Sequence, residues 1–211
     1  YDASIIGYKL WTVRSSEVVI KLDQSVGTAT IDVDATGRMW LASDESGDMY
    51  IRWSSYPYQN WSARIKIISA TEPNDLCAVV ALPALGKTGV FWSNSLSRKF
   101  GFITHNDNDS PELWSSDESP GASSAVNIGS GFAHREFSLC ATSNGTLYAA
   151  VRTNYNKSGY ARLALLVRQT NGTWSTPHTV TINEGVEPAI AISEAKNKLR
   201  VFYTLGSTGI F

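Results

Sequence analysis

The chain has 211 residues, of which 43% are hydrophobic and 18% charged, and its formal net charge is −1 at pH 7. A net charge near zero without a basic run disfavours binding to nucleic acid or to an anionic membrane surface. No apolar stretch has the length that a membrane span requires. The 11% of aromatic residues, together with many Ser, Thr, Gly and Asn, suits short strands joined by polar turns.

Strand-like segments follow one another along the chain in a repeating order. The first strand of each unit is a short apolar run, at 30–33, 76–82, 137–141 and 189–192. A turn containing Gly or Asn leads from it into a second strand, which is a β-hairpin signal. Third strands are expected at 49–53, 99–103 and 162–168, and fourth strands at 63–67 and 178–182. No window of the chain shows a helical period.

The second strands show that the unit repeats about every fifty residues. Equivalent positions are Met39, Val90, Leu147 and Leu199, at steps of 51, 57 and 52 residues. A Trp-Ser pair recurs half a unit later, beginning at Trp61, Trp114 and Trp174. Repeats of this size that consist of strands are typical of propellers. The sequence therefore predicts an all-β fold, a β-propeller of four-stranded blades.

We expect one propeller over residues 1–211, with about three whole blades and partial blades at both ends. The whole blades are predicted at 28–70, 74–122 and 134–183, and the partial blades at 1–24 and 187–211. In the second whole blade the fourth strand is poorly defined, because 115–131 is rich in Ser, Gly and Asp. Two arrangements stay open: a small ring closed by a blade that both ends share, or a portion of a larger propeller. Another protein chain would then be a partner that completes the terminal blades.

The two cysteines, Cys77 and Cys140, lie in apolar first strands of neighbouring units. We expect two buried thiols that act as small hydrophobes. A disulfide stays open, because the sequence does not tell how far apart the two Cα atoms lie. The chain also contains five Asn-x-Ser/Thr sequons, which permit a glycosylated, secreted protein without establishing one.

The segment 168–174 carries a family resemblance. Its residues Gly172, Thr173 and Trp174 resemble a degenerate Asp-box (BNR-type) turn, although the Ser and Asp of that turn are absent. The wider repeats, such as 89–94 and 165–168, look like those of sialidase-like propeller proteins, many of them secreted bacterial proteins. The resemblance implies a sialidase-like propeller fold and a secreted or cell-surface location. It does not imply sialidase activity, since the arginine clamp and the Arg-Ile-Pro motif of the active enzymes cannot be matched here.

In a propeller, the loops that join second to third strands and fourth to first strands meet at one rim, where ligands usually bind. These loops supply a set of polar residues that would bind a polyol, a cation or a charged sugar. The candidate ligand-binding residues are Asp44, Asn74, Asp75, His134, Arg135, Glu136, Arg152, Tyr155 and Glu187. No His or Cys spacing of a metal site is present, so we expect neither a metal nor a cofactor.

Three functions are compatible with this pattern. We favour a non-catalytic extracellular protein that binds carbohydrate or another extracellular ligand, because the loops are polar and aromatic and a catalytic set is missing. A sialidase-like glycoside hydrolase would use carboxylates such as Asp75, Glu136 and Glu187 as acid and base. A structural subunit of a larger propeller or filament would pair its strand edges with a partner chain.

Overall fold

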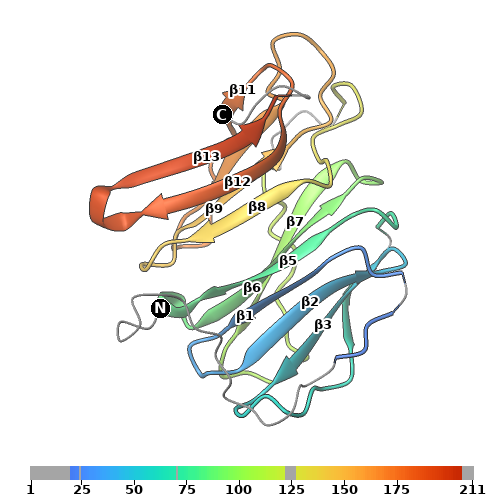
Figure 1. Cartoon of the computed structure of the whole chain (residues 1–211), viewed down its shortest axis with the longest axis vertical. Helices are drawn as coiled ribbons and strands as arrows, with labels where there is room; N and C mark the ends of the chain where they lie inside the picture. The colour runs from blue at the N-terminus through green and yellow to red at the C-terminus, as the bar shows by residue number, and fades with distance from the viewer. Residues whose placement is uncertain (1–19, 24, 70, 122–126, 206–211) are drawn as a thin grey trace, which may run out of the picture.

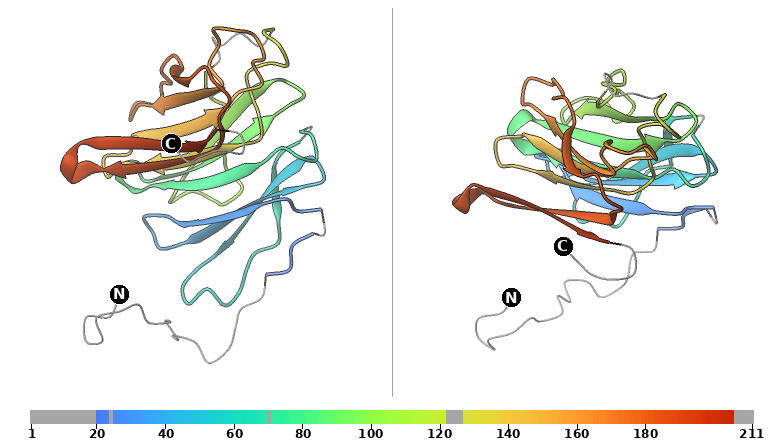
Figure 2. Two further views of the ribbon diagram at one scale, coloured as in Figure 1. Left: turned by 45° about the horizontal axis from the view of Figure 1, so that its top comes forward. Right: turned by 90° about the horizontal axis from the view of Figure 1, so that it is seen from above.

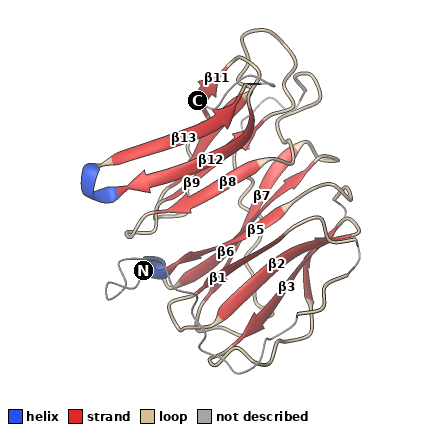
Figure 3. Cartoon of the chain, in the orientation of Figure 1, coloured by secondary structure: helices blue, strands red, loops and turns tan. Residues whose placement is uncertain are grey.

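The structure, a computed structural model, describes residues 20–23, 25–69, 71–121 and 127–205. These residues form thirteen strands in four antiparallel sheets, with two three-residue 3-10 turns as the helical elements (Figures 1 and 3). The all-β prediction is therefore confirmed. Most of the predicted partial blade at 1–24 lies outside the described residues, and so do residues 206–211. Completion of the terminal blades, by either end or by a partner chain, stays a prediction.

The sheets follow one another in chain order, and we number them 1 to 4. Sheet 1 contains β1 (Ala29–Val33), β2 (Met39–Glu45), β3 (Asp48–Ser54) and β4 (Ile65–Ile68). Sheet 2 contains β5 (Cys77–Leu82), β6 (Lys87–Asn94) and β7 (Lys99–Asn106). Sheet 3 contains β8 (Phe137–Ala141), β9 (Leu147–Arg152), β10 (Leu163–Arg168) and β11 (His178–Thr181). Sheet 4 contains β12 (Val186–Ser193) and β13 (Lys198–Thr204), and the 3-10 turns are η1 (Pro83–Leu85) and η2 (Glu194–Lys196).

The first strands of successive sheets lie side by side: β1 contacts β5, β5 contacts β8, and β8 contacts β12 (Figures 1 and 2). Polar side chains on one first strand bind backbone N–H groups of the next. Thr30 Oγ1 accepts the N–H of Val79 at 2.8 Å, and Ser138 Oγ accepts the N–H of Ile190 at 3.2 Å. These bonds satisfy donors at a sheet edge that pairing within the sheet leaves free.

Two apolar cores lie between the sheets. Between sheets 1 and 2, Trp40 and Met49 belong to the same buried cluster as Val90 and Trp92. Between sheets 2 and 3, the buried cluster contains Phe91, Phe100 and Phe102 of sheet 2 and Leu147, Ala149 and Leu166 of sheet 3. Sheet 2 is thus buried on both faces. Alternate side chains of a strand point to opposite faces, so one strand of this sheet contributes to both cores.

Two glycines in sheet 2 leave room for aromatic rings that lie over the backbone. A Cβ atom at Gly89 would stand 2.2 Å from the ring of Phe102, and one at Gly101 would stand 2.0 Å from the ring of Trp92. Any larger residue would push these rings out of the cores. The glycines in this sheet are therefore required by packing.

The recurring Trp-Ser pairs fasten the chain to the third strand of each sheet. The backbone N–H groups of Ser62, Ser115 and Ser175 donate to carbonyls of the third-strand residues Trp53, Thr104 and Val167, at 2.9, 2.8 and 2.8 Å. The ring of Trp114 packs against Trp40 of sheet 1, and that of Trp174 against Phe102 of sheet 2. These two tryptophans therefore join neighbouring sheets. In sheet 2 irregular bonds of this kind stand in place of a fourth strand, as the sequence predicted.

Both cysteines are free thiols, with Cys77 buried and Cys140 half-buried. Burial raises the pKa of each thiol, and for Cys77 the nearby carboxylate of Asp44 raises it further. Both side chains are thus protonated and act as small hydrophobes, as expected from the sequence. In the described part of the chain no helix is long and apolar enough to cross a membrane.

Candidate functional site

The structure brings together the loops that the sequence placed on one rim, and we call this end of the sheets the loop face. The β2–β3 turn is bound at Gly47, whose carbonyl accepts the N–H and the hydroxyl of Thr71, at 2.9 and 2.8 Å. The carbonyl of Arg98, in the β6–β7 loop, accepts the N–H of Ala133 at 3.2 Å. The Asn154 side chain, in the β9–β10 loop, donates to the carbonyl of Ala133 at 2.7 Å.

Two of the candidate carboxylates hold these loops in place. Asp44 is 2% exposed and accepts the backbone N–H groups of Gly27 and Thr28, at 3.0 and 2.8 Å. Asp75 is fully buried and accepts the N–H and the hydroxyl of Ser95, at 2.9 and 2.7 Å. A carboxylate whose oxygens accept several hydrogen bonds inside the protein is not available to a ligand. We therefore leave both residues out of the proposed binding surface.

Tyr155 is also buried rather than exposed, with its ring 5.7 Å from that of Phe132 and 5.5 Å from that of Tyr160. It contributes to the core beneath the β9–β10 loop. Asn74 and Arg135, by contrast, are exposed on the loop face. Sequence reasoning did not separate the buried Tyr155 from the exposed Asn74 and Arg135, because all three residues occur in polar loop segments.

We expect Asp75→Ala to destabilise the protein by about 3 kcal/mol, because the Ser93 and Ser95 groups that it binds would be left unpaired inside the protein. Urea unfolding followed by circular dichroism measures this loss. Asn74→Ala, one residue earlier and exposed, is the matched control and should leave stability unchanged. A stable Asp75→Ala variant that had lost glycan binding would return Asp75 to the binding surface.

Four of the predicted residues come together where sheets 3 and 4 meet. Glu136 Oε1 accepts from Arg152 Nη1 at 2.7 Å, and its Oε2 accepts the backbone N–H of Glu187 at 2.9 Å. The backbone of Glu187 is left-handed, with φ of 53°, which turns its N–H toward this carboxylate. The fourth residue, His134, has Nδ1 3.8 Å from Glu136 Oε1. The cluster links the two sheets and presents the Arg152 side chain, which is 32% exposed.

The cluster carries charges of both signs, with Arg135 and Glu187 exposed beside the Arg152–Glu136 pair. Burial lowers the pKa of His134, and the positive charges of Arg152 and Arg135 lower it further against the opposing effect of Glu136. The imidazole is therefore neutral at pH 7, and its Nδ1 accepts the backbone N–H of Glu136 at 3.3 Å. A ligand would therefore meet Arg135, the partly exposed Arg152 and the carboxylate of Glu187. Within the described ranges, no three His, Cys, Asp or Glu side chains are grouped to hold a metal ion.

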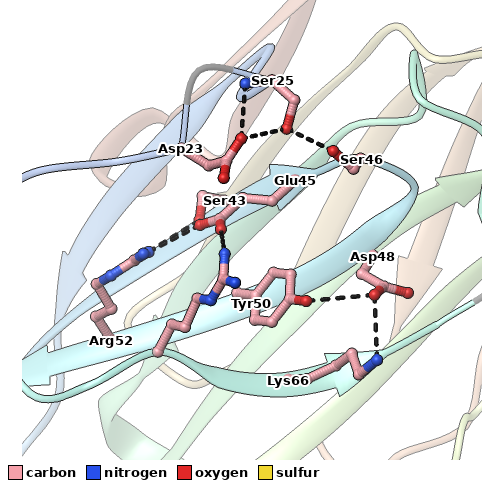
Figure 4. Close-up of polar contacts among 10 residues, drawn as sticks. Asp23, Ser25, Ser43, Glu45, Ser46, Asp48, Tyr50, Arg52 and Lys66 are labelled. Carbon is pink, nitrogen blue, oxygen red and sulfur yellow. Dashed lines mark hydrogen bonds and ion pairs between the residues drawn. The ribbon is translucent and has the colours of Figure 1, made fainter.

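A second cluster of charges lies on the face of sheet 1 that points away from sheet 2 (Figure 4). Its centre is Glu45, which is 2% exposed and accepts from Arg52 at 3.0 Å and from the hydroxyl of Ser43 at 2.9 Å. Arg64 pairs with the other carboxylate oxygen. Burial by itself raises the pKa of Glu45, but the hydrogen bonds from Arg52, Ser43 and Arg64 outweigh it and lower the pKa below its ordinary value.

A shallow, open hollow adjoins this cluster, lined by Lys21, Leu22, Asp23, Arg52 and Arg64. Three of its five lining residues are cationic. Sequence reasoning did not include Arg52 or Arg64, because each lies in or beside a strand, where an isolated arginine usually faces solvent. Arg52 lies opposite Leu41 and Glu45 lies opposite Asp48, so the two charged side chains meet along one face of the hairpin rather than as a directly facing pair. A search of facing strand pairs in the sequence would therefore not find them.

No protein-family model matches the chain, and no curated protein matches it in sequence. Solved structures do resemble it. A mutant NanB sialidase from Streptococcus pneumoniae has a TM-score of 0.54 at 15% identity, over 80% of this chain and 26% of that chain. An exo-β-1,3-galactanase from Clostridium thermocellum has a TM-score of 0.56 at 12% identity, over 90% of this chain and 44% of that chain.

These neighbours decide the fold. The chain has a β-propeller-like fold. Because the identities are below 25%, the likeness concerns the fold alone, and the chain spans less than half of either neighbour. The predicted resemblance to sialidase-like propellers is thus supported at the level of architecture. The finer Asp-box relationship stays a prediction.

Proposed function

We propose that this chain is a non-catalytic, carbohydrate-binding part of an extracellular β-propeller, and that its loop face prefers acidic glycans. One observation carries the proposal. On the loop face the carboxylates Asp44, Asp75 and Glu136 are engaged by groups of the protein, whereas Arg135 is exposed and the side chain of Arg152, paired with Glu136, is 32% exposed. A guanidinium group pairs with a carboxylate through two parallel hydrogen bonds, so sugars that carry a carboxylate suit this surface best.

Two further observations support a carbohydrate ligand. The hollow beside Arg52 and Arg64 adds a second polar surface on sheet 1, where both arginines pair with Glu45. The similar solved structures are, by name, a sialidase and a galactanase. A propeller that presents cationic loops and hydrogen-bond donors fits the same general class of ligand.

The contacts of the carboxylates support binding without hydrolysis. A glycoside hydrolase needs two carboxyl groups that face each other across a pocket, about 5–10 Å apart. Asp75 is fully buried, and both oxygens of Glu136 are occupied by Arg152 and by the backbone of Glu187. Neither group is placed to donate a proton to a glycosidic oxygen or to attack a sugar carbon. Of the three carboxylates that the sequence offered, Glu187 alone is exposed, and hydrolysis requires two.

Calorimetric titration with polysialic acid and polygalacturonate tests the proposal. We expect both acidic glycans to bind, and expect Arg135→Ala or Arg152→Ala to weaken binding about tenfold, since a hydrogen bond to a charged group contributes about 1.5–3 kcal/mol. Arg200→Ala, which removes an exposed arginine on β13, is the matched control and should bind as the parent does.

Two results would contradict this assignment. If neither acidic glycan bound the parent protein, the loop face would not be the site that we describe. If incubation with either glycan released new reducing ends, the protein would be an enzyme and the non-catalytic part would be wrong. A secreted or cell-surface location is part of the same proposal, and detection of the protein in the culture supernatant or on intact cells tests it.

A further inference from the structure

A cavity lies between sheets 3 and 4 at the end of the molecule opposite the loop face. It is bounded by the turn that joins β8 to β9 and by η2, which joins β12 to β13 (Figure 1). Its volume is about 340 Å³, within the range of about 300–1,000 Å³ that is usual for small-molecule sites. All of its lining residues belong to the described part of the chain.

The neighbouring junction shows why a cavity forms here. The last residue of each first-hairpin turn has a left-handed backbone, with φ of 57° at Gly86, 89° at Gly145 and 46° at Asn197. Between sheets 2 and 3, Leu85 fills the gap against Gly145, where a Cβ atom would stand 2.6 Å from Leu85 Cγ. The corresponding residues between sheets 3 and 4 are Asn144 and Asn197, which both line the cavity. Polar amides thus replace an apolar contact.

Several polar groups of the cavity are available to a ligand. Among the described residues, neither the hydroxyl of Tyr148 nor the side-chain amide of Asn197 has a hydrogen-bond partner. The Tyr148 side chain comes from β9, is half-buried and lines the cavity. Thr146 and Ser193 add hydroxyl groups. Hydroxyls and amides both donate and accept hydrogen bonds, as the hydroxyls of a sugar do, and an aromatic ring packs against the C–H face of a sugar.

The charges in the cavity offset each other. Glu194 and Lys198 are its two charged residues. Glu194 is also engaged by the protein, because one oxygen accepts the backbone N–H of Ser143 at 2.8 Å and the other pairs with the Ser143 hydroxyl. The hydrogen bonds between Ser143 and Glu194 join the β8–β9 turn to η2 across the junction of the two sheets. An uncharged ligand therefore fits the cavity better than an acidic one.

We propose that this cavity is a second carbohydrate site, which binds a neutral sugar residue independently of the loop face. Tyr148 supplies the ring that packs on the sugar, and the side-chain amide of Asn197 supplies hydrogen bonds to its hydroxyls. The Oδ1 of Asn144 already accepts from the Thr142 hydroxyl and the Thr146 N–H, so Asn144 contributes its amide N–H groups. The two sites lie at opposite ends of the sheets, so one chain can hold two glycan segments together. Binding to a glycan with both acidic and neutral units then gains from the effective concentration of the second segment.

Titration of the isotope-labelled chain with β-1,3-galactobiose and with cellobiose, followed by NMR, tests this site. We expect saturable shifts at the backbone amides of Asn144, Thr146, Asn197 and Lys198. Asn197→Gly removes the amide but tolerates the left-handed backbone, and should weaken binding about tenfold. Tyr148→Leu should abolish it. Lys196→Ala changes the same turn without touching the cavity lining and is the matched control.

The proposal is wrong if neither disaccharide gives saturable shifts at these amides, or if Asn197→Gly binds as the parent does. Should Tyr148→Leu fail to fold, Asn197→Gly still decides the outcome. The loop face is tested separately in the same experiment. Arg135→Ala should weaken binding to polysialic acid about tenfold and keep the neutral-sugar shifts, so that either site can fail without the other.

Discussion

Glu118→Ala is expected to destabilise the protein by about 3–5 kcal/mol, because it leaves the guanidinium group of Arg168 buried without a counter-charge. Arg168 is 2% exposed, and two of its nitrogens donate to the two oxygens of Glu118, at 2.7 and 2.8 Å. The indole N–H of Trp174 donates to the same carboxylate at 3.0 Å. Glu118 follows β7 and Arg168 ends β10, so this pair joins sheets 2 and 3.

Urea unfolding of the parent and the variant, followed by tryptophan fluorescence and circular dichroism, measures the difference. Glu112→Ala, in the same connecting segment but exposed, is the control and should leave stability unchanged. The double variant Glu118→Leu with Arg168→Met should recover much of the loss, since a buried ion pair can be replaced by apolar groups at little cost. If Glu118→Ala alone is as stable as the parent, the ion pair between Glu118 and Arg168 does not hold the two sheets together.

Glu45→Ala is expected to cost a similar amount, about 3–5 kcal/mol, for the same physical reason. The residue left without its partner is Arg52, which is 8% exposed. Asp48→Ala on the same hairpin is the matched control, because Asp48 pairs with the half-exposed Lys66 at 3.1 Å, and an exposed pair contributes less than about 1 kcal/mol (Figure 4). If Glu45→Ala and Asp48→Ala lose the same amount of stability, the assignment of Glu45 as the centre of the cluster is wrong.

The contribution of Glu45 to the free energy of unfolding also depends on pH. Its pKa in the folded protein lies below the ordinary value of 4.5, so its ionised form stabilises the fold at every pH above that value. This contribution is lost as the pH falls through the lowered pKa and the carboxylate takes up a proton. The difference in unfolding free energy between the parent and Glu45→Ala should therefore be full at pH 7 and shrink under more acidic conditions. A difference that grew on acidification would contradict this account.

The arrangement of strands was largely predictable from the sequence. Apolar alternation and Gly- or Asn-containing turns are local signals, and they marked segments such as 137–141 within a residue or two of the strand that the structure has. Among the described residues sheet 2 has three strands, and a poorly defined fourth strand was also predictable, because the segment 115–131 is rich in Ser, Gly and Asp. Whether the sheets close into a ring depends on contacts between distant parts of a chain, which no local pattern reports.

The polar sites were less predictable. Asp75 and Glu136 both precede a first strand and look alike in sequence, but one is buried beneath its loop while the other faces its neighbour across a sheet junction. No sequence pattern marked the cavity between sheets 3 and 4. It arises where Asn144 and Asn197 occupy the positions that Leu85 and Gly145 occupy at the junction of sheets 2 and 3.

The sequence alone determined that the chain is a series of repeated antiparallel strands, since strand periodicity and turn chemistry depend on neighbouring residues. Only the tertiary structure decided which charges are buried in pairs and which stay exposed. The reason is that partners such as Glu118 and Arg168 lie 50 residues apart in the chain and meet only when two sheets pack together. Burial, which decides whether a charge serves the fold or a ligand, is a property of that packing.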